Sequence, residues 1–592
     1  MWNLCTSVLP CIASLVAKKR ANQIYYYVVE STRVDGKPRI VHQTYLGTAG
    51  RVAALVKDRT APVPLSATSL DFGPPGALWR AALELGVFDL LTSLWPSPRS
   101  GPSTAHYLLL AAIHRICQPG PKTEVADWYR RTILAPLWGF PAERFTSQAF
   151  WDCFDRLRAG GDDDELDQAQ IRLIGAWRDR QLVGHRLLAY DTTNFHTYVA
   201  STNSRNQLAQ RGHNKQGRHN LRQVGLSYVL DGDNGLGLCH HVYPGNVTDA
   251  DELPAALSRL VTLLDRNQIG RDSVTLVLDK GSAALANTLE LQQAGVGWIS
   301  ALPWNQAPAE LRERDFEKLN PCGSAQPGVR AAAEPMIVHG RQYLCVLKYS
   351  SSFAAEQLHS LTASLAKAMQ NLRRLALELA KPRARFEERG IRKKITRWLA
   401  PDSLAELVHC DLQPVDGRWQ LTFDFDHQAW LSLMAHRLGR IVLLTNRLDW
   451  TADQVVAGYS GQQRIEQVSR GLKDGDWLGW GPMHHWTGSK IRIHAFYCML
   501  GVSLLQSIHR RAHSVWPGLS IDQLLTELDK IKQFVLLYPA QGEKGPPRTA
   551  TVLSTQTLTQ QSLAEALGLD KLLSSSRGQY GHLPRTASRS VP

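Results

Sequence analysis

The sequence predicts an α/β protein whose core is a mixed sheet interrupted by an insertion, and three observations carry that prediction. Strand and helix patterns alternate from residue 185 to 302, as three strands, a helix, a strand, a helix and a strand. Strand character then returns in GRIVLLTN, and a long helical segment follows from Thr451 to about Lys473. Between these two parts, residues 303–438 combine loops, short strands and a basic helical stretch, which is typical of an insertion.

The regions on either side of this core have their own patterns. At 592 residues the chain is long enough for two to four structural units. Near the N-terminus, β-branched and aromatic runs flank Asp35-Gly36-Lys37-Pro38, which predicts a hairpin over 24–46. We therefore expect an N-terminal β-hairpin region at 1–60, a helical domain at 61–180, the first part of the core at 181–302, the insertion at 303–438, the second part of the core at 439–540, and a polar, largely disordered tail at 541–592.

Composition favours a protein that meets a polyanion in a reducing compartment. The formal net charge is +14, which favours nucleic acid as a partner. The nine cysteines are odd in number and form no C-x-x-C pair, so we expect neither a disulfide framework nor a thiolate zinc site. The apolar stretch around residues 495–505 is shorter than the roughly 20 residues of a membrane span. We expect a cytoplasmic protein without a membrane span.

Two carboxylates occupy positions with a structural meaning. Asp191 ends the predicted strand HRLLAYD, and Asp279 ends the predicted strand SVTLVLD. In open α/β sheets the carboxyl ends of strands hold ligands and ions. Neighbouring carboxylates repel one another unless a cation lies between them, and Mg²⁺ prefers oxygen ligands. The alternative is that each is an ordinary strand-end aspartate that caps backbone N–H groups.

The helical segment after the second part of the sheet carries a third candidate. In YSGQQRIEQVSRGLK, the residues Tyr459, Glu466, Arg470 and Lys473 are spaced by seven, four and three positions. On one continuous helix this spacing places all four on one face. A hydroxyl, a carboxylate and two cations suit a site for metal and phosphate. The alternative is a solvated face with an ordinary Glu466–Arg470 ion pair.

With these residues in place, the sequence resembles the DDE-type insertion-sequence transposases, in particular the insertion-sequence-four-like group with the signature Y-x2-R-x3-E-x6-K. Tyr459, Glu466 and Lys473 match the spacing of that signature. The resemblance extends, in order, through YDTTNFHTY, RGHNKQGRHNLRQVGL, YPGNVTDADEL, LDKGS and GPMHHWTGSKIRIHAFYCML. Gln462 stands in place of the signature arginine, and Ser469 where an aromatic residue is common.

The resemblance implies an RNase H-like core and a metal-dependent reaction on DNA. Asp191, Asp279 and Glu466 would be the catalytic residues and would hold two Mg²⁺ ions, for which Mn²⁺ could substitute. The protein would bind the element's terminal inverted repeats and the target DNA as a homodimer or higher oligomer, in a prokaryotic cytoplasm, associated with the nucleoid. Two alternatives remain open: a metal-dependent DNA nuclease, and a catalytically idle DNA-binding descendant of a transposase.

Basic segments indicate where DNA would lie. Residues 192–230 contain five cations and no acid, and residues 364–398 contain eleven cations against three acids. The alternative for the second segment is a solvated helix. Phosphate contacts of this kind carry no sequence information, so we expect the helical domain at 61–180 to recognise the DNA ends. The predicted DNA-binding residues are Tyr459, Arg470, Lys473, Arg205, Arg211, Lys215, Arg218, Arg222, Arg392, Lys393 and Lys394.

Overall fold

Within the chain, the computed structural model describes residues 12–20, 23–34, 37–57, 64–96, 100–161, 164–183, 187–212, 217–218, 220–279, 285–323, 327–381, 386–400, 404–473, 478–481, 484–539 and 548–575. The chain divides into two compact units. One consists of Met1–Leu70 with Lys532–Thr555, and the other of Asp71–Ile531 with Gln556–Pro592.

The first unit contains two small antiparallel sheets. One sheet is formed by β1 (Ile12–Arg20), β2 (Gln23–Val34) and β3 (Lys37–Thr48), and α1 (Ala49–Lys57) follows it. The pairing of β2 with β3 confirms the predicted hairpin. The Lys18 ammonium lies 5.2 Å from the centre of the Tyr27 ring, so a cation and an aromatic side chain share one face of this sheet. The other sheet has the order β17-β16-β4, from Arg548–Leu553, Lys532–Tyr538 and Ser66–Asp71.

A helical region opens the second unit. Pro74 and Pro75 occupy the first turn of α2, where the missing proline N–H groups leave no bond broken. The Ser103 side chain caps α4, whose residues are almost all buried, and α4 packs against the long helix α18 (Gly488–Val515). The helices of this region are α2 (Gly73–Glu84), α3 (Val87–Leu94), α4 (Thr104–Cys117), α5 (Val125–Arg130), α6 (Leu134–Trp138), α7 (Ser147–Phe154) and α8 (Glu165–Asp179).

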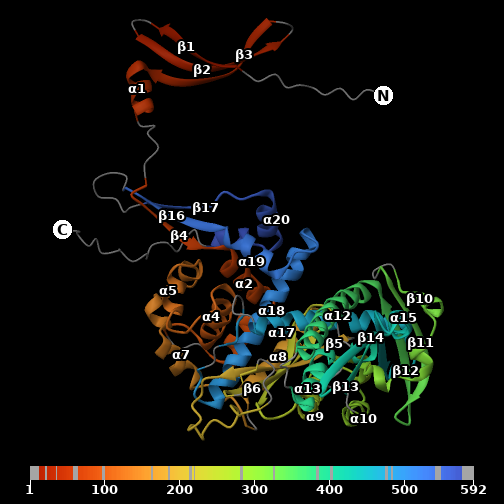
Figure 1. Cartoon of the computed structure of the whole chain (residues 1–592). Helices are drawn as coiled ribbons and strands as arrows, with labels where there is room; N and C mark the ends of the chain where they lie inside the picture. The colour runs from red at the N-terminus through yellow and green to blue at the C-terminus, as the bar shows by residue number, and fades with distance from the viewer. Residues whose placement is uncertain are drawn as a thin grey trace. The chain divides into compact units, whose positions relative to one another are not determined.

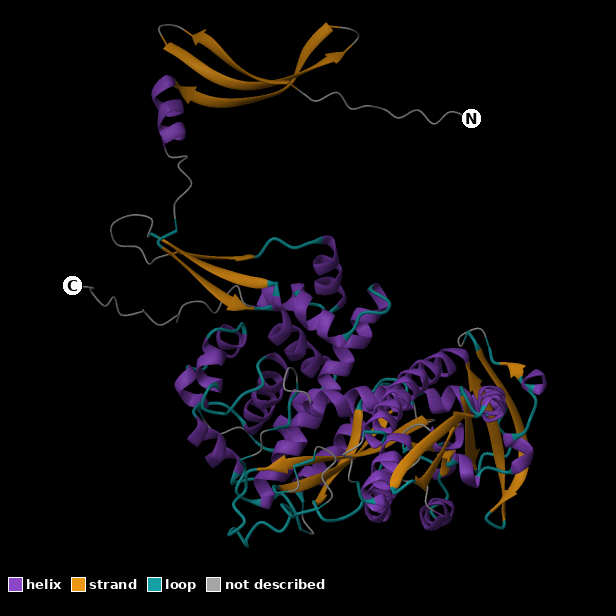
Figure 2. Ribbon diagram, viewed as in Figure 1, coloured by secondary structure: helices purple, strands orange, loops and turns teal. Residues whose placement is uncertain are grey.

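A nine-stranded mixed sheet forms the centre of the second unit (Figures 1 and 2). Its order is β10-β11-β12-β15-β9-β8-β5-β6-β7. Counted along the chain from β5, the strands β7-β6-β5-β8-β9 have the order 3-2-1-4-5, with the first three antiparallel and the last two parallel to the first. This is an RNase H-like arrangement. The five strands are β5 (Leu187–Thr197), β6 (Arg222–Asp231), β7 (Gly237–Pro244), β8 (Thr275–Leu278) and β9 (Gly297–Leu302).

The alternation predicted for residues 185–302 is confirmed by this sheet. Helix α9 (Asp249–Arg266) connects β7 to β8, and α10 (Leu285–Gln293) connects β8 to β9. All four residues of β8 and nine of the ten in β6 are buried. Burial on both faces explains why the sequence of β8 is almost entirely apolar. Strand β15 (Arg440–Thr445) pairs antiparallel with β9, so the returning strand belongs to the same sheet.

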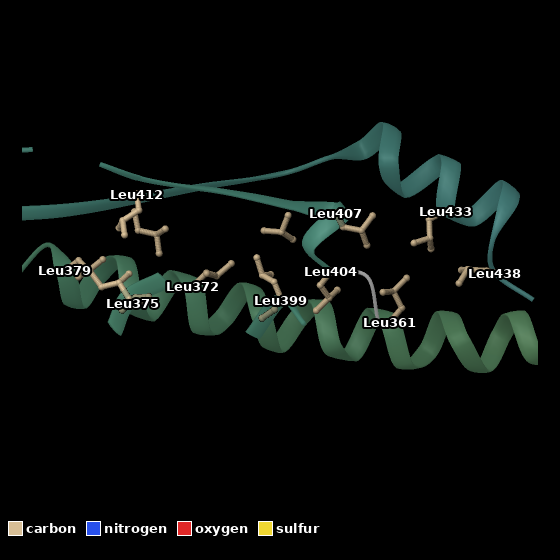
Figure 3. Packing of buried hydrophobic residues seen from close by; sticks show 14 residues of the cluster. Leu361, Leu372, Leu375, Leu379, Leu399, Leu404, Leu407, Leu412, Leu433 and Leu438 are labelled. Carbon is tan, nitrogen blue, oxygen red and sulfur yellow. The ribbon is translucent and has the colours of Figure 1, made fainter. Parts of the chain in front are cut away.

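The stretch at 303–438 divides into two parts. Strands β10 (Asn320–Pro321), β11 (Val329–Val338) and β12 (Arg341–Ser350) extend the central sheet. The rest has a leucine-rich core of its own, in which α12 packs against β14 and α15 covers one end (Figure 3). The elements of this second part are α12 (Ser351–Leu379), α13 (Glu388–Leu399), α14 (Leu404–Leu407), β13 (Val408–Val415), β14 (Arg418–Phe425) and α15 (His427–His436).

Three details differ from the sequence-based expectations. The helical segment from Thr451 is two helices, α16 (Ala452–Ser460) and α17 (Gln462–Lys473), because the first helix is capped at Gly461. The second part of the core, expected at 439–540, ends in α19 (Ile521–Asp529), because the next element, strand β16, belongs to the sheet β17-β16-β4.

The tail is the third difference, because part of it is ordered. Residues 541–592 include β17, α20 (Leu558–Ala566) and α21 (Asp570–Ser575). Four leucines of this tail are buried in the core, although their polar neighbours hide the apolar pattern: Leu563, Leu567, Leu569 and Leu572. Residues 576–592 lie outside the described part of the chain.

One described helix, α18, is long and apolar enough to cross a membrane. Most of its apolar stretch is buried inside the protein, as in the central helix of a packed core. It therefore gives no indication of a membrane span.

Candidate active site

The two candidate aspartates lie side by side in the middle of the central sheet. Asp279 directly follows β8, as expected, but Asp191 does not end its strand, because β5 continues to Thr197. In the parallel pair β5 and β8, Tyr190 is the register partner of Leu278. Asp191 and Asp279 each come one residue later and are therefore also neighbours. Adjacent strands lie about 4.8 Å apart, and residues in register point to the same face. The expected convergence of the two carboxylates at neighbouring strand positions follows directly from this register.

Asp191 is held by three hydrogen bonds. Its Oδ1 accepts from the Thr192 backbone N–H at 2.8 Å. Its Oδ2 accepts from the Tyr228 hydroxyl at 3.3 Å and from the Ser469 hydroxyl. Burial raises the pKa of Asp191, the Asp279 charge raises it further, and the hydrogen bonds from Ser469 and Thr192 together with the Lys473 charge act in the opposite direction.

Helix α17 carries the third candidate carboxylate, Glu466, and lies over β5, the strand that carries Asp191. Ile465, Val468 and Leu472 are buried on its inner side, whereas Glu466, Arg470 and Lys473 are exposed. The apolar residues thus seat the helix on the sheet, and the charged residues remain accessible to a ligand.

Tyr459 lies near the same carboxylates even though it belongs to a separate helix. It is the second-last residue of α16, two residues before Gly461, so the four residues do not lie on the one continuous helix that the sequence suggested. Burial raises the pKa of Tyr459 to about 12, and the charges of Asp279 and Glu466 contribute to that rise. The phenol therefore keeps its proton near neutral pH and can donate a hydrogen bond.

The donor set suits a hard divalent cation. Carboxylate oxygens are the ligands that Mg²⁺ and Mn²⁺ prefer, and Asp191 and Asp279 supply them from adjacent strands. In the described part of the chain, no three His, Cys, Asp or Glu side chains are gathered closely enough to hold a metal ion. The in-register aspartates are therefore the part of the candidate site that this arrangement brings together, with Glu466 on the helix packed over β5.

Of the predicted DNA-binding residues from Arg205 to Arg222, some are exposed and one is bonded within the protein. Arg205, Arg211 and Arg218 are exposed, whereas Lys215 lies outside the described residues. Arg222 instead donates to the carbonyl oxygens of Ser201 and Asn203, at 2.7 and 2.9 Å. Its guanidinium therefore ties the loop to β6, which leaves fewer of its N–H groups for phosphate.

The basic face of the insertion lies on α13. Arg392, Lys393 and Lys394 are all exposed on this helix. Arg392 is ion-paired with Glu388 at 2.7 Å, and the Lys394 ammonium lies 5.5 Å from the centre of the Phe386 ring. The ammonium groups of Lys393 and Lys394 are therefore exposed at this surface, where a phosphate group can reach them.

Tyr228 and Ser469 are the site residues that sequence reasoning missed. Tyr228 stands in the middle of an apolar strand pattern, where an aromatic side chain is expected in the core. Ser469 differs from the aromatic residue common at that position of the signature, and this departure was its only signal. Tyr228 meets Asp191 through the pairing of β5 with β6, and Ser469 meets it through the placement of α17 over β5; no local pattern encodes either.

A comparison with protein families covers the stretch of chain that contains these residues. A family model described as "Transposase DDE domain" matches residues 183–502, the stretch from just before β5 into α18. A search of curated proteins finds no match. Among solved structures, the piggyBac transposase synaptic complex with hairpin DNA, determined by cryo-electron microscopy, is similar over 78% of this chain and 82% of that chain. The two are 9% identical, with a TM-score of 0.32.

The central sheet has an RNase H-like strand order and carries neighbouring aspartates at its first and fourth strands in chain order from β5. Because the family model covers more than half of the residues, the chain belongs to the transposase DDE domain family. It is a DNA transposase by family, with DNA as its partner and a reaction of the divalent-metal-dependent kind.

Proposed function

We propose that this protein is the transposase of a prokaryotic insertion sequence, which binds the element's terminal inverted repeats and catalyses DNA cleavage and strand transfer. The observation that carries the proposal is the register of β5 and β8, which makes Asp191 and Asp279 neighbours under the helix that bears Glu466. The family match over residues 183–502 supports the reaction class.

In this proposal Asp191, Asp279 and Glu466 hold two Mg²⁺ ions. When bound, such a pair activates the attacking water or 3′-OH and stabilises the leaving oxygen. The protein's part is to fix the carboxylates, and the packing of α17 on β5 gives Glu466 a short path to the aspartate pair. Mn²⁺ shares the same oxygen ligands and is expected to support the reaction.

The neighbouring side chains bind the phosphates. Tyr459 keeps its proton because of burial and the nearby charges of Asp279 and Glu466, so it can donate to a phosphate oxygen. Lys473 acts on the Asp191 carboxylate, which places a cation close to it. With Gln462 in place of the signature arginine, Arg470 is an exposed guanidinium on α17 that can contact the DNA backbone.

Further surfaces would hold the rest of the DNA. Arg205, Arg211 and Arg218 lie beside the first catalytic strand, and the basic helix α13 belongs to the insertion. The helical domain at 61–180 would recognise the ends, in a dimer or higher assembly on DNA, within the nucleoid. These assignments rest on charge and on position in the fold.

The test is strand cleavage and joining on duplex DNA that carries the element's own ends. The reaction is run with Mg²⁺, with Mn²⁺ and with EDTA, beside the Glu466→Ala protein. We expect metal-dependent cleavage at the ends followed by joining to target DNA, both lost in the variant while end binding persists. Cleavage without any joined product would identify a nuclease, and tight end binding without cleavage would identify an idle descendant.

A further inference from the structure

Two hydroxyl groups meet at the same oxygen of Asp191. The Tyr228 hydroxyl lies 3.3 Å from Asp191 Oδ2, and the Ser469 hydroxyl donates to that oxygen. The two hydroxyl oxygens are also within hydrogen-bond distance of each other. Because Ser469 donates its proton to Asp191, the single Tyr228 proton is shared between Asp191 Oδ2 and Ser469 Oγ. The Tyr228 hydroxyl lies 3.5 Å from the carbonyl oxygen of Ile465 as well, one residue before Glu466.

The three side chains come from three different elements. Tyr228 on β6 is the direct register partner of Asp191 on β5, and Ser469 lies on α17, about one turn after Glu466. Tyr228 is 1% exposed and Ser469 is 8% exposed. Because water hardly reaches these hydroxyls, their hydrogen bonds must be made within the protein. The cluster therefore joins the Asp191 strand to the Glu466 helix through buried polar contacts.

We propose that Tyr228 and Ser469 are positioning residues for the metal-binding carboxylates. Their hydroxyls hold Asp191 Oδ2 in place. The contacts of Tyr228 with Ile465 and of Ser469 with Asp191 also set the distance between α17 and β5, and therefore the distance from Glu466 to the aspartates. This inference rests on the proposed function, in which Asp191 and Glu466 hold the ions. The Ser469 hydroxyl and the Thr192 N–H donate to the carboxylate, and the Tyr228 hydroxyl lies beside Oδ2, so the orientation of Asp191 is set by the protein itself.

Hydroxyl-deletion variants isolate this role. Tyr228→Phe keeps the ring in the core, and Ser469→Ala removes one oxygen atom. Ser469→Thr restores a hydroxyl at the same place. The matched control is Tyr343→Phe on β12 of the same sheet, since the buried Tyr343 hydroxyl has no hydrogen-bond partner within the described residues. Thermal unfolding of the metal-free proteins tests whether each variant is folded.

The first readout is metal binding without DNA or turnover. Mn²⁺ is titrated into the metal-free full-length protein, and free Mn²⁺ is followed by electron paramagnetic resonance, with Asp191→Ala marking the signal that depends on this carboxylate. Loss of a residue that orients a metal ligand weakens affinity by about 10- to 100-fold. We expect losses of that size in Tyr228→Phe and Ser469→Ala, recovery in Ser469→Thr, and wild-type binding in the control.

The second readout is the dependence of end cleavage on Mg²⁺ concentration. We expect both deletion variants to need more Mg²⁺ for half-maximal rate while binding the DNA ends with unchanged affinity. If both folded variants bind Mn²⁺ like the wild type, or if the control loses as much as they do, the inference is overturned. Should Tyr228→Phe fail to fold, Ser469→Ala and Ser469→Thr decide.

The Mn²⁺ titration distinguishes a wrong inference about Tyr228 and Ser469 from a wrong proposed function. Mn²⁺ binding that is unchanged by Asp191→Ala would remove Asp191 from the metal site and overturn the proposed mechanism together with this inference. Binding that is lost with Asp191→Ala but kept in both hydroxyl variants would leave the proposed function standing and overturn the inference alone.

Discussion

At the scale of single residues, the ionised form of Asp191 is disfavoured by some neighbouring groups and favoured by others. Asp279 opposes ionisation of Asp191, whereas the hydrogen bonds from Ser469 and Thr192 and the charge of Lys473 favour it. Charges placed in this way are stable together only when cations or hydrogen-bond donors are close by. The same arrangement of carboxylates therefore suits the site to a divalent ion.

Removing either aspartate should abolish the chemistry. In Asp279→Ala the ion loses one of its two in-register ligands, and a bound metal supplies several kcal/mol of transition-state stabilisation, so we expect the cleavage rate to fall by ~10³-fold or more. End binding, measured by gel shift, should change little because α13 and the loop after β5 are untouched. Cleavage near the wild-type rate would contradict the assignment of Asp279.

Tyr459 should assist the reaction without being the nucleophile. A hydrogen bond to a charged group contributes about 1.5–3 kcal/mol, so Tyr459→Phe should lower the cleavage rate by roughly 10- to 100-fold and leave the ring packed. Denaturing gels of the reaction should show no protein attached to DNA. A covalent adduct in the wild type that is absent in Tyr459→Phe would refute the metal-only mechanism.

At the scale of elements, the insertion has a hydrophobic core that can be weakened separately. Leu372 on α12 is fully buried among the leucines of this core (Figure 3). Truncation of such a side chain costs about 2–5 kcal/mol, so Leu372→Ala should lower the midpoint of thermal unfolding of the insertion. Leu377→Ala is the matched control, because Leu377 lies on the same helix and is 71% exposed. Equal effects of the two changes would show that this core does not support the insertion.

Helix α13 should contribute to DNA binding through charge alone. Each phosphate contact that is lost reduces the slope of log K against log salt concentration by about one, so Lys393→Gln with Lys394→Gln should reduce it by about two. Arg392→Gln is the comparison, since its guanidinium is already paired with Glu388 and should matter less. Binding isotherms at several salt concentrations give these slopes. Unchanged slopes in the double variant would leave this helix as a solvated face.

The sequence was most informative where local pattern and position coincide. Asp191 and Asp279 could be predicted because each follows a buried apolar run; Asp279 does follow the end of its strand, whereas β5 continues six residues beyond Asp191, to Thr197. The helix break before α17 could not, because the residues around Gly461 keep a helical pattern. The attachment of β11 and β12 to the central sheet depends on long-range pairing, which short-range periodicity does not encode.

At the scale of the whole molecule, the family match and the fold concern the same stretch of chain. Residues 183–502 begin just before β5 and end within α18, the helix that packs against both β7 and the helical region. The catalytic sheet therefore shares its central helix with α2 and α4. Changes in the helical region can reach the site through this shared core, which makes the stability of the second unit relevant to its chemistry.

Buried histidines should make that stability sensitive to acid. Burial lowers the pKa of His106 to about 4, and burial with the nearby Arg115 and Lys122 charges lowers that of His114 to about 3. Both groups bind protons more tightly in the unfolded chain, so their stabilising contribution is complete above about pH 6.5 and is lost as the pH falls toward the folded-state values. For the fully buried His114, this loss reaches about 2 kcal/mol at pH 5.

Thermal unfolding between pH 7.5 and pH 5 should therefore show a falling midpoint, and the fall should be smaller in His114→Phe. Phenylalanine keeps a ring against Trp128, which meets His114 edge to face at 5.0 Å, but cannot take up a proton. His42→Gln is the matched control because His42 is exposed, and it should follow the wild type. If His114→Phe and the wild type lose the same stability between these pH values, protonation of His114 does not govern the acid response, and the neutral state assigned to its buried ring is wrong.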